Sequence, residues 1–179
     1  MVAGVAAFVS WLGASLVVLG DGRRALALGV LLATAGMTVI AWQTAGPLAA
    51  AAIAGGGAVA AARRFSSGAD GWRIMPPGST PRLVLCIAGG LIVLWIAAAV
   101  TTGPGASLRF TVMVVAGFSG ARVLASDNAS VLLTATSLLA LVVALAGAFA
   151  DGSGLWTYLA AALIAAGVGW LPQRTARAG

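Results

Sequence analysis

Few side chains in this sequence could carry out chemistry, and those few stand apart from one another. Histidine, glutamate and lysine are absent, and the only acids are four isolated aspartates. Without histidine the chain lacks the usual ligand of haem iron and the base of a Ser-His-Asp triad, and without lysine it lacks a Schiff-base amine. The single cysteine, Cys86, cannot hold an iron–sulfur cluster. We therefore expect no catalytic residue, no metal site and no cofactor.

The aspartates occur where turns and helix starts are expected. Asp21-Gly22 and Asp151-Gly152 are typical of tight turns, and Asp127 shortly precedes an apolar run, in a segment that can cap its helix. No two acids have a spacing that would bind magnesium-pyrophosphate. Structural roles are therefore favoured over catalysis, and an enzyme is the least favoured class of function.

One polar stretch, residues 63–82, combines cations with aromatic rings. Its candidate contact residues are Arg63, Arg64, Phe65, Trp72, Arg73 and Arg82. Two interpretations stay open: a basic loop lying on anionic lipid headgroups, worth about 1 kcal/mol per arginine, or a docking site for a cytoplasmic partner. The net charge of +6 does not indicate nucleic acid, because the arginines are scattered between long apolar runs.

Trp11 and Trp95 lie near the middle of two apolar runs, away from the headgroup region where tryptophan is common. A buried indole N–H needs an acceptor. Packing against a neighbouring helix is the favoured role for both residues. The alternative is that they line a groove for a small solute.

The composition indicates that lipid surrounds most of the chain. Hydrophobic residues make up 61% and charged residues 8%, with a mean hydropathy of +1.06, whereas soluble domains carry about 25% charged residues. No basic residue precedes the first apolar run, so we expect a retained span there and not a cleavable signal peptide. The predicted fold class is an all-α integral membrane protein, a polytopic transmembrane helix bundle that forms a single domain over residues 1–179.

A spanning helix needs about 20 apolar residues, and seven runs approach that length. The predicted spans are residues 2–19, 25–42, 47–62, 83–100, 110–125, 130–150 and 155–171. The third and fifth are the shortest, at roughly 24 Å of helix against about 30 Å of hydrocarbon, so five- and six-span arrangements are alternatives. Arg122, one turn from the end of the fifth run, has a stem long enough to reach the headgroups.

The arginines predict the orientation. With seven spans, all ten arginines except Arg109 fall on one side of the membrane. The positive-inside rule assigns that side to the cytoplasm, which places the N-terminus outside, the C-terminus inside and the loop 63–82 in the cytoplasm. Abundant arginine, alanine and glycine without lysine suggests a GC-rich bacterial genome. The expected location is the bacterial inner membrane.

Small residues at four-residue spacing predict close helix packing. The clearest examples are Ala52, Gly56 and Ala60 in the third run and Ala116 and Gly120 in the fifth. The triplet Gly55-Gly56-Gly57 would destabilise an isolated helix by about 1 kcal/mol per glycine relative to alanine. Such a helix needs other helices around it, either in a tight bundle or in an interface with partner chains.

The functional hypothesis that follows is a non-catalytic, multi-pass subunit of a larger bacterial inner-membrane complex. Its partners would be membrane lipids and other membrane protein subunits, in a hetero- or homo-oligomer. The alternative is a transporter or channel component that moves a neutral or apolar small solute through a groove near Trp11 and Trp95.

Overall fold

A computed structural model of the chain describes residues 1–66, 71–74, 80–100, 105–149 and 154–171. Within these ranges the structure is helical, apart from short turns and one isolated bridge between Gly20 and Ile74. The longer helices are α1 Val2–Leu19, α2 Arg23–Thr44, α3 Pro47–Ser66, α6 Ala106–Leu124, α7 Ala129–Ala146 and α8 Leu155–Val168. A 3₁₀ turn, Gly147–Phe149, follows α7 directly.

Residues 80–100 form one further rod with an irregular helical geometry. The α-helical pieces α4, Thr80–Val84, and α5, Gly90–Trp95, alternate with the π-helical turns Leu85–Gly89 and Ile96–Val100. In this rod Cys86, Gly90 and Ala97 are buried, whereas large apolar side chains such as Leu91 and Trp95 are exposed. The rod is therefore attached to the rest of the bundle along a narrow strip.

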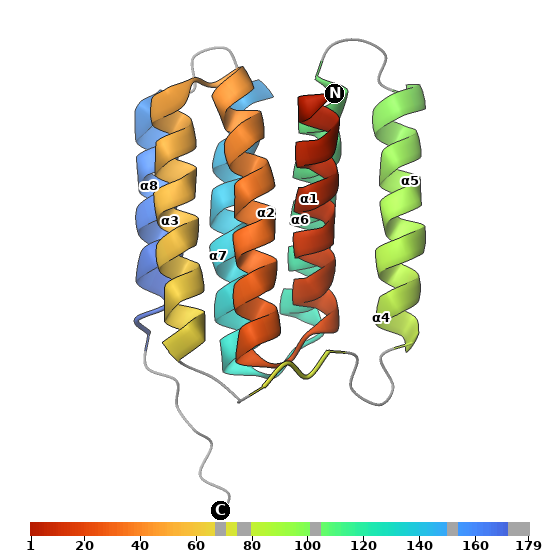
Figure 1. The fold of residues 1–179 in the computed structure, drawn as a ribbon, viewed down its shortest axis with the longest axis vertical. Coiled ribbons are helices and arrows are strands. Elements are labelled where there is room, and N and C mark those ends of the chain that lie inside the picture. Colours follow the sequence, from red (N-terminus) through yellow and green to blue (C-terminus); the bar gives the residue numbers. More distant parts are fainter. Residues whose placement is uncertain (67–70, 75–79, 101–104, 150–153, 172–179) are drawn as a thin grey trace, which may run out of the picture.

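The helices form two layers (Figure 1). Helices α1, α2 and α3 lie side by side in one layer, and α6, α7 and α8 form the second layer behind them, with α1 against α6 and α3 against α8. The rod of residues 80–100 stands at one edge, beside α1 and α6. The opposite edge of the bundle is made by α3 and α8.

The core lies between the layers and is filled mainly from α2 and α7. Its largest fully buried side chains include Leu26, Met37, Ile40, Leu138 and Leu141. Within the first layer, α1 and α2 approach closely enough to require small residues. A Cβ on Gly13 would overlap the backbone of Ala33, and a Cβ on Gly36 would overlap Ser10.

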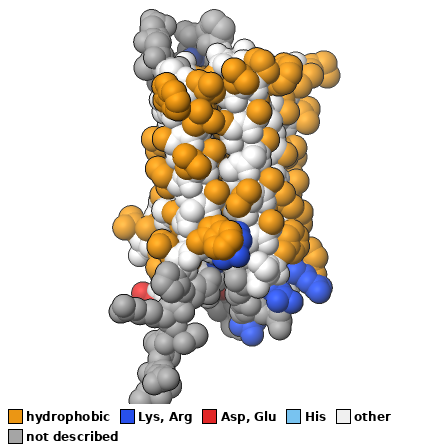
Figure 2. Space-filling model, turned by 90° about the vertical axis from the view of Figure 1, so that its left-hand side faces the viewer, with side chains coloured by type: hydrophobic (Ala, Val, Ile, Leu, Met, Phe, Trp, Pro, Cys, Tyr) orange, Lys and Arg blue, Asp and Glu red, His pale blue; other side chains and the backbone are white. Residues whose placement is uncertain are grey.

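The predicted helical bundle is confirmed, and its apolar helices fit a membrane protein. Four helices in the described part of the chain are long and apolar enough to cross a membrane: α1, α2, α6 and Ala129–Phe149. The apolar helices Thr80–Trp95 and Leu155–Val168 are shorter, and α3, which carries Arg63 and Arg64 in its last turn, is not among the four. Figure 2, which faces the edge made by α3 and α8, shows hydrophobic side chains over the wall of the bundle and most of the visible arginine side chains near its lower end.

Several helices, α2 among them, extend beyond the predicted runs, and α3 and α6 do so furthest at one end. Helix α6 begins at Ala106, directly after Gly105 with φ +97°, and not at residue 110. Helix α3 continues through Arg63 and Arg64 to Ser66. In both cases the apolar run stops at an arginine, although a helix can continue through one because the long side chain turns toward a polar group. The predicted turn at Asp151-Gly152 and residues 67–70 and 75–79 of the basic stretch lie outside the described residues.

Candidate functional site

An ion cluster at the lower end of the bundle joins three helices. Asp21, in the turn between α1 and α2, pairs through Oδ2 with Arg82 Nη1 of α4 at 3.3 Å and through Oδ1 with Arg122 Nη2 of α6. Arg122 also donates to the carbonyl of Gly20 at 3.3 Å and is 3% exposed. The side chain of Arg122 is long enough to reach the headgroups, but it turns inward because the carboxylate of Asp21 lies within its reach.

Residues 71–74 lie across the same turn. The amide of Asp21 donates to the carbonyl of Arg73 at 3.1 Å, and the amide of Arg24 donates to that of Gly71 at 3.4 Å. Gly71 has φ +88°, a conformation that favours glycine. A Cβ on Gly22 would overlap the carbonyl of Gly71. Asp21-Gly22 is therefore the predicted turn, and residues 71–74 of the basic stretch are hydrogen-bonded beside it.

A second group of arginines lies at the other edge of the bundle, where α3, α7 and α8 end or begin. Arg64 is 2% exposed and its Nη1 donates to the carbonyl of Ser130 at 3.1 Å. Its Nη2 is buried and has no hydrogen-bond partner. Arg63 lies over the ring of Trp170, 3.9 Å from the ring centre, and donates to the carbonyl of Gly169 at 3.4 Å.

The basic stretch is thus divided between two places. Arg82 joins the ion cluster of Asp21, whereas Arg63 and Arg64 belong to the corner of α3, α7 and α8. Phe65 and Trp72 are about half exposed, at 50% and 48%. Arg73, with φ +35°, contributes its backbone carbonyl. This division was not predictable from the sequence, because partners such as Asp21 and Ser130 are remote in the chain.

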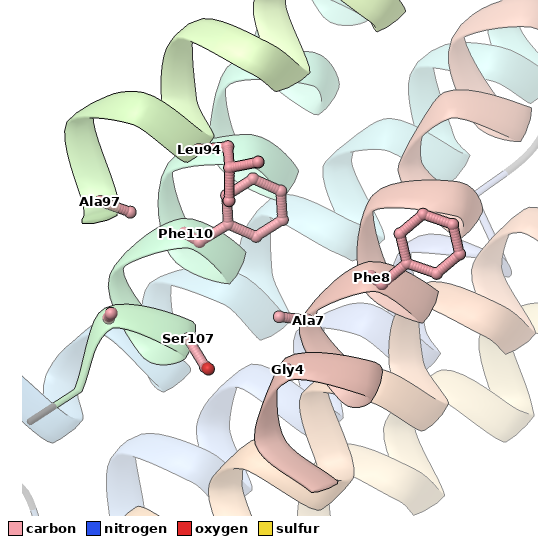
Figure 3. Close-up of a pocket in the computed structure, with 8 residues that line it drawn as sticks. Gly4, Ala7, Phe8, Leu94, Ala97, Ser107 and Phe110 are labelled. Atoms are coloured by element: carbon pink, nitrogen blue, oxygen red, sulfur yellow. The ribbon is translucent and has the colours of Figure 1, made fainter. Parts of the chain in front are cut away.

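An apolar groove runs between α1, α5 and α6 (Figure 3). It contains two adjoining hollows of about 190 Å³ each, which share Phe8, Leu94 and Phe110. Figure 3 shows Leu94 close to the ring of Phe110, with Phe8 approaching from α1. Ser107 borders one hollow and Trp11 the other. The lining of the groove suits an apolar chain or ring.

Trp11 packs against the rod of residues 80–100 and lines this groove. Its Nε1 donates to the carbonyl of Cys86 at 3.1 Å, and a Cβ on Gly90 would overlap the indole. Trp95 is 64% exposed and borders neither hollow. The structure therefore does not bring the two tryptophans together in this groove.

The two predicted small-residue stripes have different surroundings. Gly56 faces α8, where an added Cβ would lie 2.8 Å from the Cα of Ala162, and Ala60 is buried on the same side; Ala52 is partly buried and packs against the core. In α6, Ala116 and Gly120 are partly buried, and a Cβ on Gly120 would meet nothing within 4 Å. The first stripe packs within the chain, whereas Gly120 leaves space beside it.

Comparison with known proteins adds no relative to this picture. No family model matches the chain, no curated protein matches it, and no solved structure matches it.

Proposed function

We propose that the chain is a non-catalytic, multi-pass subunit of a larger bacterial inner-membrane complex, and that α3 carries a surface for another subunit. The supporting observation is the outer side of α3, at the edge of the bundle (Figure 1). Its exposed small residues Ala51, Gly55, Ala58 and Ala62 lie on one side of the helix, together with the exposed Leu48 and Val59, and are here called the α3 face.

The α3 face offers lipid few large side chains. Insertion into a membrane is favoured by leucine, isoleucine, phenylalanine and valine. On this side of the helix Leu48 and Val59 are of this kind, whereas the four residues of the face are alanine or glycine. Helix α3 is also absent from the four helices whose composition suffices for spanning. Small side chains let a second helix backbone approach closely, and packing is the main force between helices in lipid. A helix from a partner chain would cover the face at little steric cost.

Adjacent glycines of α3 illustrate the difference between the two sides. Gly56 is buried against Ala162 of α8, where a side chain would not fit. A Cβ on Gly55 would meet nothing within 4 Å. Packing inside the chain therefore explains Gly56, whereas the side of Gly55 is left open to a helix of another chain.

The proposal includes seven spans, with the N-terminus outside the cell. The alternation of helix directions supports it: the described arginines of α3, α4 and the α1–α2 turn lie at one end of the bundle and Arg109 at the other. The positive-inside rule assigns the arginine-rich end to the cytoplasm.

Substitution of Gly55 tests the docking surface. The Gly55→Leu chain, produced in its native membrane and extracted in mild detergent, should lose its stoichiometric partners in affinity purification, because leucine fills the space that the partner helix needs. The isolated chain should melt no lower than the wild type, because leucine is the better helix former. Gly117→Leu is the matched control, since Gly117 on α6 is equally open. Full retention of partners by Gly55→Leu would refute the docking surface.

A second candidate function is favoured by the groove between α1, α5 and α6. Its apolar lining fits a neutral, apolar solute, as in a transporter or channel component. Ser107→Trp, at a partly buried position, would fill the hollow that Ser107 borders and should abolish binding of such a solute while leaving partner association intact. Unchanged uptake or binding of apolar solutes in this variant would count against the second candidate.

A further inference from the structure

Arg64 is a buried cation that has no carboxylate partner in the described part of the chain. One nitrogen, Nη1, bonds the carbonyl of Ser130, and the other, Nη2, is buried with no partner at all. A buried charge is destabilising unless it is paired and its N–H groups are satisfied. The single neutral carbonyl does not meet either requirement. The corner therefore presents a buried guanidinium whose N–H groups are not all satisfied within the described part of the chain.

The surroundings of Arg64 add positive charge. Ser130 lies in the first turn of α7, an 18-residue helix with no acidic residue in that turn, and its own amide is capped by the side chain of Asn128. A helix N-terminus carries partial positive charge and stabilises anions. Arg63 precedes Arg64 and is held beside this corner by the carbonyl of Gly169. An anion here would be attracted by two guanidinium groups and by the end of a helix.

Trp170 indicates the depth of the corner in the membrane. Its ring is 67% exposed and stacks on Arg63, and tryptophan is enriched at the level of the lipid headgroups. Figure 2 shows arginine side chains at the lower margin of the hydrophobic wall on this side of the bundle. Phosphate groups of lipids occupy the same depth.

We propose that Arg63, Arg64 and the first turn of α7 bind the phosphate of an anionic phospholipid. The planar fork of Arg64 matches two phosphate oxygens, which would satisfy Nη2. An anionic headgroup is favoured over a zwitterionic one, because the latter would bring a second cation into a positive corner. The bound lipid would hold the ends of α3, α7 and α8 together. This proposal does not depend on a partner chain, because the α3 face and the corner are formed by different residues.

Lipid titration of the purified, delipidated full chain tests the site by native mass spectrometry. The wild type should bind phosphatidylglycerol about tenfold or more tightly than phosphatidylcholine, because both carry the phosphate but only phosphatidylcholine adds a cation beside the two guanidinium groups. Arg64→Gln should abolish this preference, and Arg64→Lys should retain part of it, because lysine keeps the charge without the fork. Arg24→Gln removes an exposed arginine at the same end and should change the affinity less than about twofold.

Three outcomes would overturn the proposal. Equal binding of the two lipids by the wild type would exclude a preference for anionic headgroups, and this comparison needs no variant to fold. An effect of Arg24→Gln as large as that of Arg64→Gln would indicate a diffuse charge effect. If inorganic phosphate raises the Tm as much as phosphatidylglycerol does, at matched phosphate concentration, the site binds a soluble anion and not a lipid. If Arg64→Gln does not fold, Arg63→Gln takes its place with the same expectation.

Discussion

Removing the charge of Asp21 should destabilise the bundle through Arg122. In Asp21→Asn the side chain keeps its size, but the buried guanidinium of Arg122 loses its carboxylate. Breaking a buried ion pair costs about 3–5 kcal/mol, because the remaining charge stays buried. The side chain of Asp21 is 27% exposed, so water screens the pair, and we expect a loss of about 2 kcal/mol.

The single cysteine provides the assay. Cys86 is 2% exposed, so a thiol-reactive dye should label it only when the structure opens on heating in detergent. By the scaling for soluble domains of similar length, a loss of about 2 kcal/mol lowers Tm by roughly 4–8 °C. Arg82→Gln is the control: the side chain of Arg82 is 34% exposed, and its loss should cost at most about 1 kcal/mol.

A double variant separates the lost ion pair from other effects of the substitution. Asp21→Asn combined with Arg122→Met removes the charge that Asp21→Asn leaves buried, and apolar replacement of a buried pair is often neutral or stabilising. The double variant should therefore be more stable than Asp21→Asn by about 1 kcal/mol or more. Wild-type melting of Asp21→Asn, or a double variant no more stable than the single one, would show that Asp21 does not hold the charge of Arg122.

Three further predictions concern packing and topology. Gly56→Leu should destabilise the isolated chain by about 1–3 kcal/mol through overlap with α8, and an unchanged Tm would place Gly56 away from α8. Trp11→Phe removes the hydrogen bond to the rod of residues 80–100 and should lower the stability by about 1 kcal/mol. Cys86 should then be labelled faster in the folded protein. Labelling at the wild-type rate would mean that this bond does not hold the rod. In a Cys86→Ser background, Gln43→Cys should react with an impermeant reagent added outside intact cells, and Ser126→Cys should not. The reverse pattern would show that the chain has the opposite orientation in the membrane.

Local hydrophobicity made the positions of the helices predictable from sequence. Helix α1 has the bounds Val2–Leu19 of the first predicted run, because an apolar run with glycine at its end needs no other part of the chain to define it. Arginines limited this reasoning. A run was expected to stop near Arg63 and to begin after Arg109, whereas α3 and α6 continue through these residues, since an arginine stem can stay in a helix while its charge reaches a distant group.

The partners of the polar residues were decided only by the tertiary structure. Asp21 and Arg122 are 101 positions apart, and Arg64 and Ser130 are 66 apart, so no spacing in the sequence relates them. The same holds for the two sides of α3. Small residues recur every three or four positions both along the stripe of Gly56 and along the face of Gly55, but only the position of α8 decides which side is covered. The hydrophobicity of a segment is a sum over neighbouring residues and can be calculated from the sequence, whereas burial and pairing depend on which helices pack against each other. The composition thus determined a helical chain suited to lipid, and the packing of the two layers decided which arginines, glycines and tryptophans are available to bind anything.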